Sequence, residues 1–125
     1  MMQIPTHRRR TLLAAAALSL AGAAAAQSSD APLHMVVTFP PGGSTDIAAR
    51  IMQPELETRL GRPVVVENRP GAASQLATSH VAKSAPNGNT VLVAFDTHAI
   101  NPIAKSRLPY DTFKDFAGVT LAVRF

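Results

Sequence analysis

The chain has 125 residues, enough for about one domain, and it contains no cysteine, which excludes disulfides and thiolate metal sites. The net charge of +4 arises largely from Arg8, Arg9 and Arg10. After residue 26 the chain carries nine basic and eight acidic side chains, so it offers no basic patch of the kind that binds nucleic acid.

The first 26 residues have the pattern of an export signal. The three arginines precede the apolar run "TLLAAAALSLAGAAAA", which ends in the small-x-small pattern Ala24-Ala25-Ala26. The run is too short and too rich in alanine for a comfortable membrane span. We therefore predict a signal peptide over 1–26 and a periplasmic location, with a buried Ala/Leu helix as the alternative. "RRRTLL" also fits a twin-arginine signal, so both this route and the general secretory route stay open.

The first structural unit after the signal is a strand, a turn and a helix. Residues 33–39 are rich in β-formers and predict a strand, "PPGG" predicts a turn, and a helix is expected over 44–60. Gly61 should end this helix, and Ser44 or Thr45 should cap its start. Pro54 should kink the helix without breaking it. The apolar residues near helical spacing are Ile47, Ile51, Met52, Leu56 and Leu60.

The rest of the chain repeats this alternation. We predict a strand over 63–67, a helix over 73–84, a central strand over 90–95, a loop at "DTHAINP" and a strand over 117–123. The second helix should place Leu76, His80 and Val81 on one face. This order predicts an α/β fold built from right-handed, parallel βαβ units.

Three loops follow the carboxyl ends of these strands, at 40–45, 68–74 and 96–101. Ligands of open parallel sheets bind at this edge, where helix N-termini offer free N–H groups to anions. The loops combine glycines with hydroxyl side chains and so suit a small carboxylate or phosphate. The same glycines would serve a turn that needs φ > 0 whether or not it binds anything. The residues concerned are Gly42, Gly43, Gly71, Ser44, Thr45, Ser74 and Thr97.

Other classes of site lack essential parts. Neither G-x-x-x-x-G-K-[ST] nor G-x-G-x-x-G occurs, so a phosphate loop or a dinucleotide fold has little support. A Ser–His–Asp hydrolase could be drawn from Ser44, His98 and either Asp46 or Asp96, but the G-x-S-x-G elbow is absent. The four histidines lack metal-ligand spacing, and we expect neither a metal nor a cofactor.

Five segments occur in an order that resembles a known family: "FPPGGSTDIAARIM", "LGRPVVVENRPGAAS", "VAKSAPNGNTVLVA", "THAINP" and "LPYDTFKDFAGVTLA". The chain resembles the periplasmic solute-binding proteins of the tripartite tricarboxylate transporter system, the Bug family. The resemblance implies the type II periplasmic binding-protein fold, in which two α/β lobes close on a ligand. Residues 27–125 would then form part of the first lobe of a truncated chain.

The resemblance also implies a function and a site. The parent protein would be monomeric, would capture a small carboxylate without catalysis and would deliver it to a membrane permease. The family often has glycine where this chain has Ala73, Ser74 and Ala77. The alternatives are a small exported serine hydrolase and a gene remnant without function. The implied ligand-binding residues are Pro41, Gly42, Gly43, Ser44, Thr45 and Asp46, then Gly71, Ala72, Ala73 and Ser74, and finally Thr97, His98 and Asn101.

Overall fold

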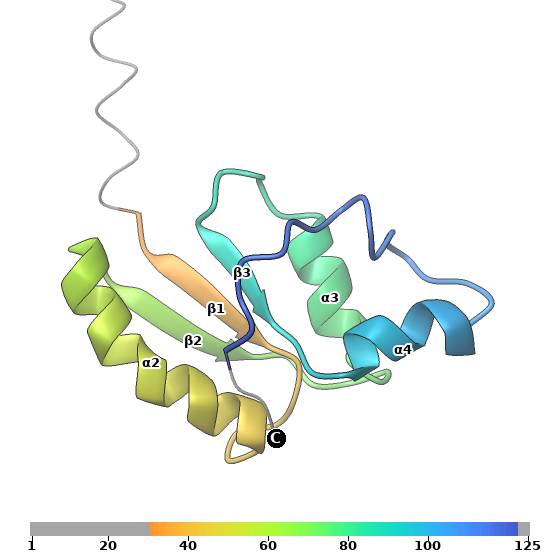
Figure 1. The fold of residues 1–125 in the computed structure, drawn as a ribbon, viewed down its shortest axis with the longest axis horizontal. Helices are drawn as coiled ribbons and strands as arrows, with labels where there is room; N and C mark the ends of the chain where they lie inside the picture. The colour runs from red at the N-terminus through yellow and green to blue at the C-terminus, as the bar shows by residue number, and fades with distance from the viewer. Residues whose placement is uncertain (1–30, 123–125) are drawn as a thin grey trace, which may run out of the picture. The chain divides into compact units, whose positions relative to one another are not determined.

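A computed structural model of the chain describes residues 31–122. Strands and helices alternate along these residues (Figure 1). The predicted α/β class with a parallel sheet is confirmed, whereas the predicted signal peptide lies outside the described residues. The elements are β1 (Leu33–Val37), α2 (Ser44–Leu60), β2 (Val64–Asn68), α3 (Gln75–Ala82), β3 (Thr90–Val93) and α4 (Thr97–Ala104).

The sheet has three parallel strands in the order β2-β1-β3. Leu33 of β1 lies opposite Val64 of β2, and His34 lies opposite Thr90 of β3. The prediction of a central third strand is therefore wrong, because β1 is the strand that pairs on both sides. The side chains of β3 are only partly buried, so its apolar composition reflects two partly covered faces at an edge of the sheet.

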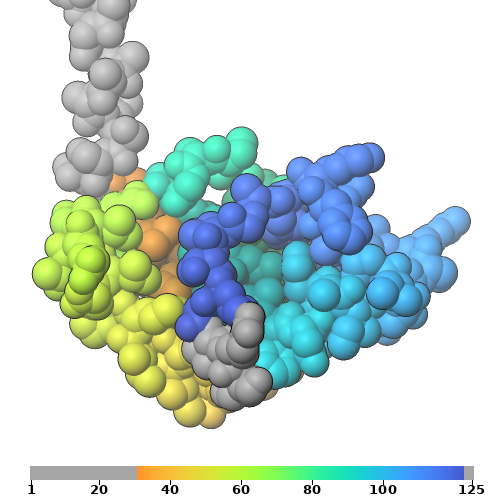
Figure 2. Space-filling view, in the orientation of Figure 1, coloured from red at the N-terminus to blue at the C-terminus, as the bar shows by residue number. Residues whose placement is uncertain are grey.

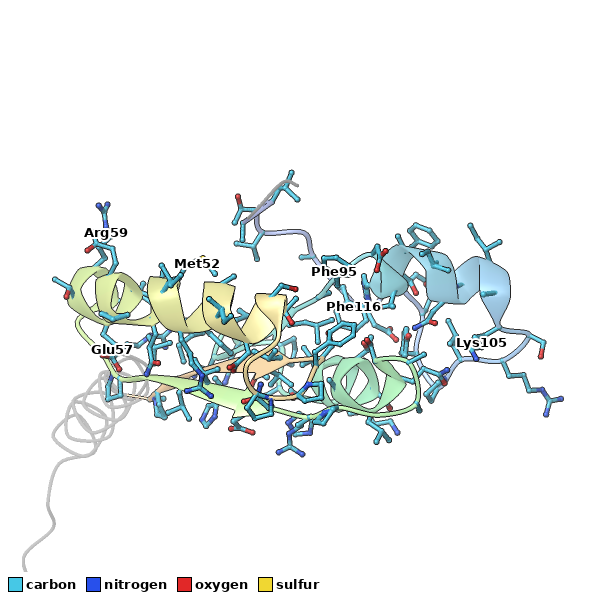
Figure 3. All side chains as sticks on the ribbon, turned by 90° about the horizontal axis from the view of Figure 1, so that it is seen from below. Met52, Glu57, Arg59, Phe95, Lys105 and Phe116 are labelled. Atoms are coloured by element: carbon cyan, nitrogen blue, oxygen red, sulfur yellow. The ribbon has the colours of Figure 1, made fainter. Side chains whose placement is uncertain are left out.

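Helices cover both faces of the sheet. Successive side chains of a strand point to opposite faces. Leu33, Met35 and Val37 pack in one cluster with Ala49 of α2. Val36 points to the other face and is fully buried, and α3 packs against β1 and β3 there. Figure 3 shows α2 above the sheet.

Helix α2 has the predicted bounds, and only some of its regularly spaced apolar residues pack against the sheet. Gly61 ends it in the left-handed conformation, with φ of 63°, and Pro54 lies inside it without ending it. Met52 and Leu56 pack against the core, whereas Ile47 and Ile51 are 51% and 73% exposed. The small side chain of Ala49 faces the sheet instead, because it allows a close approach of helix and strands.

Two segments near the C-terminal end differ from the prediction. The expected loop "DTHAINP" belongs to helix α4, where Pro102 removes only one N–H group from the helical ladder. No strand occurs among residues 117–122, where one was predicted. A strand needs a hydrogen-bonded neighbour, and Val119 and Leu121 are largely exposed here instead.

An apolar groove of about 590 Å³ separates this last segment from α2. Met35 and Val93 contribute to its floor, Met52 lines it from α2, and Val119 and Leu121 line it from the C-terminal segment. Figure 2 shows the hollow between α2 and the blue segment. Within residues 31–122 no helix has both the length and the apolar character needed to cross a membrane.

Side chains of α2 partly cover the free edge of β2. The N–H of Val64 donates to Glu57 Oε1 at 3.0 Å, and Gln53 Nε2 donates to the carbonyl oxygen of Val64 at 2.7 Å. Glu57 lies beside the end of the strand in Figure 3. These bonds satisfy backbone groups that an edge strand would otherwise leave unpaired. They also hold the buried Val64 side chain against the core.

Neighbouring valines in β2 provide a test of this core. Val64→Ala should lower the free energy of unfolding by about 2 kcal/mol, because a buried side chain leaves a cavity. Val65 is 39% exposed on the opposite face, so Val65→Ala should change stability by less than about 0.5 kcal/mol. Urea denaturation of both variants measures the difference. Equal losses would contradict the described orientation of β2.

Candidate ligand-binding site

Three loops meet at the carboxyl edge of the sheet: the first loop (38–43), the second loop (69–74) and the third loop (94–96). Each pair of loops is linked. Asn68, just before the second loop, donates from Nδ2 to the carbonyl oxygen of Phe39 at 3.1 Å. The Phe39 and Phe95 rings join the first and third loops edge to face, with centroids 6.1 Å apart. The Oγ of Ser74 lies 3.0 Å from Oγ1 of Thr97, so the second loop is tied to the start of α4.

The first loop turns into α2 without the expected side-chain cap. Gly42 has φ of 85°, a conformation that favours glycine. Gly43 is the N-cap residue and has φ of −73°, so the expected positive φ belongs to Gly42 and not to Gly43. Neither Ser44 nor Thr45 caps the helix. Asp46 reaches back to accept the Gly42 N–H at 2.8 Å, because a carboxylate in the first turn can satisfy the loop that precedes it.

The N-terminus of α2 keeps free hydrogen-bond donors. The first helical bond runs from the N–H of Ile47 to the carbonyl oxygen of Gly43. Within the described residues, the N–H groups of Ser44, Thr45 and Asp46 have no acceptor. The Oγ1 of Thr45 is buried and also has no partner. These groups lie at the positive end of the helix dipole, which attracts anions.

A hollow of about 400 Å³ lies beside this helix start. Its walls combine aromatic rings, prolines and glycine backbone, and among residues 31–122 no Lys or Arg side chain lines it. Figure 3 shows Phe95 between the start of α2 and α4. An anion here would be held by N–H groups and not by an ion pair. The lining residues are Phe39, Pro40, Pro41, Gly42, Gly43, Ser44 and Phe95.

The second loop has a left-handed backbone. Gly71 has φ of 133°, a backbone conformation that favours glycine, and a Cβ atom there would also lie 2.7 Å from the end of the Leu76 side chain. Ala72, Ala73 and Ser74 follow with φ of 49°, 51° and 72°. A non-glycine residue in this conformation costs about 1–2 kcal/mol. The three positions therefore store strain that the rest of the fold must offset.

Helix α4 holds the strained second loop in place. Asn101 is almost completely buried and donates from Nδ2 to the carbonyl oxygen of Ala73 at 2.9 Å. Together with the Thr97–Ser74 contact, this bond fixes the loop from the α4 side. The backbone N–H groups of the first turn of α4 are mostly used, since those of residues 98–100 donate to Phe95 and Asp96 carbonyl oxygens. The first turn of α4 therefore offers fewer free N–H donors than the start of α2.

His98 lies in an aromatic cluster. Its ring stacks on Tyr110, with centroids 6.4 Å apart, and meets Phe116 edge to face at 5.0 Å. Its Nδ1 is buried without a hydrogen-bond partner, and burial lowers the pKa of His98 from 6.5. Among residues 31–122 no hydrogen bond connects Ser44, His98 and either Asp46 or Asp96, so the geometry of a hydrolase triad is not assembled.

Asp46 is 3% exposed, and both of its oxygens accept hydrogen bonds. The bond from Arg50 lowers its pKa most, followed by those from the Gly42 N–H and from Asn68 Nδ2, to about 2. Asp46 is therefore ionised at neutral pH. No group of three His, Cys, Asp or Glu side chains within residues 31–122 could hold a metal ion.

Several residues at this edge were not singled out from the sequence. Asn68 is a polar residue that ends an apolar strand at the carboxyl edge, and this position could have marked it. Phe39 and Phe95 also follow strands, but nothing in their spacing predicts that their rings meet. Arg50 could have been paired with Asp46 from the i,i+4 spacing on a helix.

In this site a loop leads from the carboxyl end of a parallel strand to a helix N-terminus with free N–H groups. This arrangement is typical of α/β proteins that bind small anions. Residues 48–125 match the model of the tripartite tricarboxylate transporter family receptor. The chain belongs to this family, which confirms the resemblance read from the sequence.

Individual relatives agree with this assignment. Protein BugT of Bordetella pertussis is 39% identical over 110 residues, which are 83% of this chain and 34% of BugT. A solved structure of a periplasmic transporter has a TM-score of 0.65 and 41% identity over 71% of this chain and 30% of its own. MatC of Rhodopseudomonas palustris, solved with bound malate, has a TM-score of 0.62 and 36% identity over 68% of this chain and 29% of its own. The chain thus spans about a third of the length of these relatives.

Two alanine-to-glycine changes should have opposite effects on stability. Ala73→Gly should raise the free energy of unfolding by about 0.5–1 kcal/mol, since relief of the left-handed strain exceeds the entropy cost of glycine. Ala77→Gly lies in α3 at a fully buried position and should lower it by about 1 kcal/mol or more. Chemical denaturation of both variants decides this. Destabilisation by Ala73→Gly would contradict the described backbone of the second loop.

Acidification should weaken the fold through His98. Because its folded pKa is lowered, its contribution to stability is present above the unfolded value of 6.5 and is lost as pH falls through the folded pKa. His98→Phe keeps an aromatic ring but does not titrate, so the variant should lose less stability than the wild type between about pH 7 and pH 5. Thermal denaturation across this range measures the slopes. Parallel slopes would show that His98 is not buried in its neutral form.

Proposed function

We propose that the parent protein is a periplasmic solute-binding component that captures a small carboxylate and delivers it to a membrane permease of the tripartite tricarboxylate type. The observation that carries this proposal is the start of α2. Among residues 31–122 the N–H groups of Ser44, Thr45 and Asp46 have no acceptor, and Ser44 lines the anion-sized hollow between the first loop and Phe95. No covalent chemistry is needed for such capture, so the proposed role is not enzymatic.

The comparisons support the carboxylate as the ligand class. The family is named for a tricarboxylate transporter, and the related MatC structure holds malate. In this chain the carboxylate oxygens would accept hydrogen bonds from Ser44 and Thr45 and from the second loop at 72–74. The Ser44 hydroxyl can supply a further donor. Pro41 and the glycines at 42 and 43 would shape the wall around the ligand.

We further propose that residues 1–26 direct export and that residues 27–125 form part of the first lobe of a two-lobed binding protein. This division is supported by the coverage of the relatives, of which the chain matches about a third. A ligand held by one lobe faces water on its other side, and exposed ion contacts contribute only about 0–1 kcal/mol each. The chain alone should therefore bind carboxylates in the millimolar range, or about −4 kcal/mol.

Thermal denaturation of the chain with L-malate, citrate or glutamate tests the proposal. Ligand at 100 times its dissociation constant should stabilise the fold by about 2.7 kcal/mol, and we expect this only at tens of millimolar or above. A saturable shift at micromolar ligand would show that one lobe suffices. A folded chain unaffected by any of the three carboxylates at about 100 mM would contradict carboxylate binding.

Gly43→Val should weaken malate binding more than it weakens folding. The φ of −73° is accessible to valine, and a Cβ atom would meet the Pro40 carbonyl oxygen at 3.3 Å, a tight contact that a small shift relieves. The branched side chain would then occupy the hollow beside Ser44. Gly118→Val is the control, because a Cβ atom there meets open space and Gly118 does not line this hollow. Calorimetric titration with malate and a thermal melt of each variant separate the two effects; wild-type affinity in folded Gly43→Val would place the ligand elsewhere.

A further inference from the structure

Both carboxylate oxygens of Asp46 accept hydrogen bonds from other groups of the protein. Oδ2 accepts the Gly42 N–H at 2.8 Å and Arg50 Nε at 3.0 Å, and Oδ1 accepts Arg50 Nε at 3.0 Å and Asn68 Nδ2 at 2.9 Å. The side chain is almost completely buried. Every donor comes from the protein, so the carboxylate has little capacity left for a bound solute.

Asn68 and Arg50 extend these bonds to the sheet. Besides its bond to Asp46, Asn68 Nδ2 donates to the carbonyl oxygen of Phe39, and Arg50 Nη2 donates to Asn68 Oδ1 at 3.2 Å. The three side chains come from the first turn of α2, its second turn and the last residue of β2. We call Asp46, Arg50 and Asn68 the loop anchor. It holds the first loop at both ends, through the Phe39 carbonyl and the Gly42 N–H.

Electrostatics argue against direct contact between Asp46 and an anionic ligand. A free carboxylate at the start of α2 would repel a bound carboxylate at close range. Arg50 balances the charge of Asp46, and the bond to Gly42 turns Oδ2 back toward the loop. The helix start can therefore attract an anion although it carries an acidic residue.

We propose that Asp46 is a positioning residue of the ligand site, which acts through the loop anchor and does not touch the ligand. This assignment rests on the proposed function and replaces the ligand-contacting role that the sequence resemblance implied for Asp46. The anchor sets the left-handed turn at Gly42 and thereby the position of Phe39 against Phe95. It also places Asn68 directly before the second loop, so one set of hydrogen bonds fixes the distance between the two loops.

Loss of the anchor should damage the site before it damages the fold. Asp46→Asn keeps the shape of the side chain but removes the charge, and its amide would present N–H groups to Arg50 and Asn68, which are themselves donors. The Gly42 N–H bond would weaken, and the first loop would gain freedom. The sheet and the α2 cluster around Ala49 do not involve Asp46 and should persist.

The matched control lies on the same helix. Glu55 and Arg59 form another i,i+4 pair, with Arg59 Nε 2.6 Å from Glu55 Oε1, but this pair is exposed and far along the helix from the loops. Arg59 projects from the opposite end of α2 in Figure 3. Glu55→Gln therefore removes the same kind of charge pair without touching the anchor.

The experiment measures two quantities on the full chain and on the variants Asp46→Asn, Asn68→Ala and Glu55→Gln. The first is hydrogen exchange of the Gly42 amide without ligand, and the second is the affinity for L-malate. Asp46→Asn should exchange Gly42 at least about tenfold faster and bind malate at least about tenfold more weakly, with circular dichroism unchanged. Glu55→Gln should match the wild type in both. The double variant Asp46→Asn/Asn68→Ala should lose no more affinity than the worse single variant, because both act through one loop.

Each other outcome decides against part of the proposal. A folded Asp46→Asn chain with wild-type malate affinity and fast Gly42 exchange would show that the loop position does not govern binding. Unchanged Gly42 exchange would show that Asp46 does not hold the loop. Wild-type protein that binds no malate, citrate or glutamate would overturn the proposed function, and Gly42 exchange would still decide whether the anchor exists. If Asp46→Asn fails to fold, Asn68→Ala carries the affinity comparison: it keeps the Gly42–Asp46 bond but removes the bonds from Asn68 to Asp46 and to the Phe39 carbonyl oxygen, so it should still weaken malate binding. Wild-type malate affinity in folded Asn68→Ala would contradict the proposal.

Discussion

Parallel pairing of β1 with both of its neighbours is the constraint on which the site depends. Parallel strands end at the same edge of a sheet, so the three loops that follow β1, β2 and β3 are brought together whatever their sequences. The strands must then return by crossovers, and these crossovers supply the helices. A helix start thus follows each loop, and the edge gathers N–H groups that no strand could offer.

The three loops use this edge differently. At α4 the first-turn N–H groups are mostly satisfied by carbonyl oxygens of Phe95 and Asp96, whereas at α2 they stay free. The second loop is strained at Ala72, Ala73 and Ser74 and is held by Asn101 and Thr97. Polar side chains of this region therefore serve mainly to fix backbone. The N–H groups in the first turn of α2 stay available to an anion. Such a site attracts the anion through the helix dipole and not through an ion pair.

The strand–loop–helix order and the bounds of α2 could be predicted from the sequence because they depend on local patterns. The family could be predicted because five of its segments occur in order along the chain. The sequence did not predict which strand is central, because the apolar run of β3 at an edge looks the same as that of a buried strand. It also missed α4, since Pro102 reads as a breaker although it removes only one helical hydrogen bond. The bond from Asn68 to Asp46 and the bond from Asn101 to Ala73 join residues 22 and 28 positions apart, which no local pattern encodes.

The most direct test of the central claim, that a carboxylate binds at the linked loops, is to map the backbone amides that respond to L-malate. Two-dimensional ¹⁵N–¹H spectra of the labelled chain, recorded during a titration, report each amide separately. We expect the largest saturable shifts at Ser44, Thr45 and residues 72–74, with little change along the apolar groove at Met52 and Val119. Saturable shifts confined to the groove or to the opposite end of the sheet, with the amides of Ser44 and Thr45 unchanged, would contradict the claim.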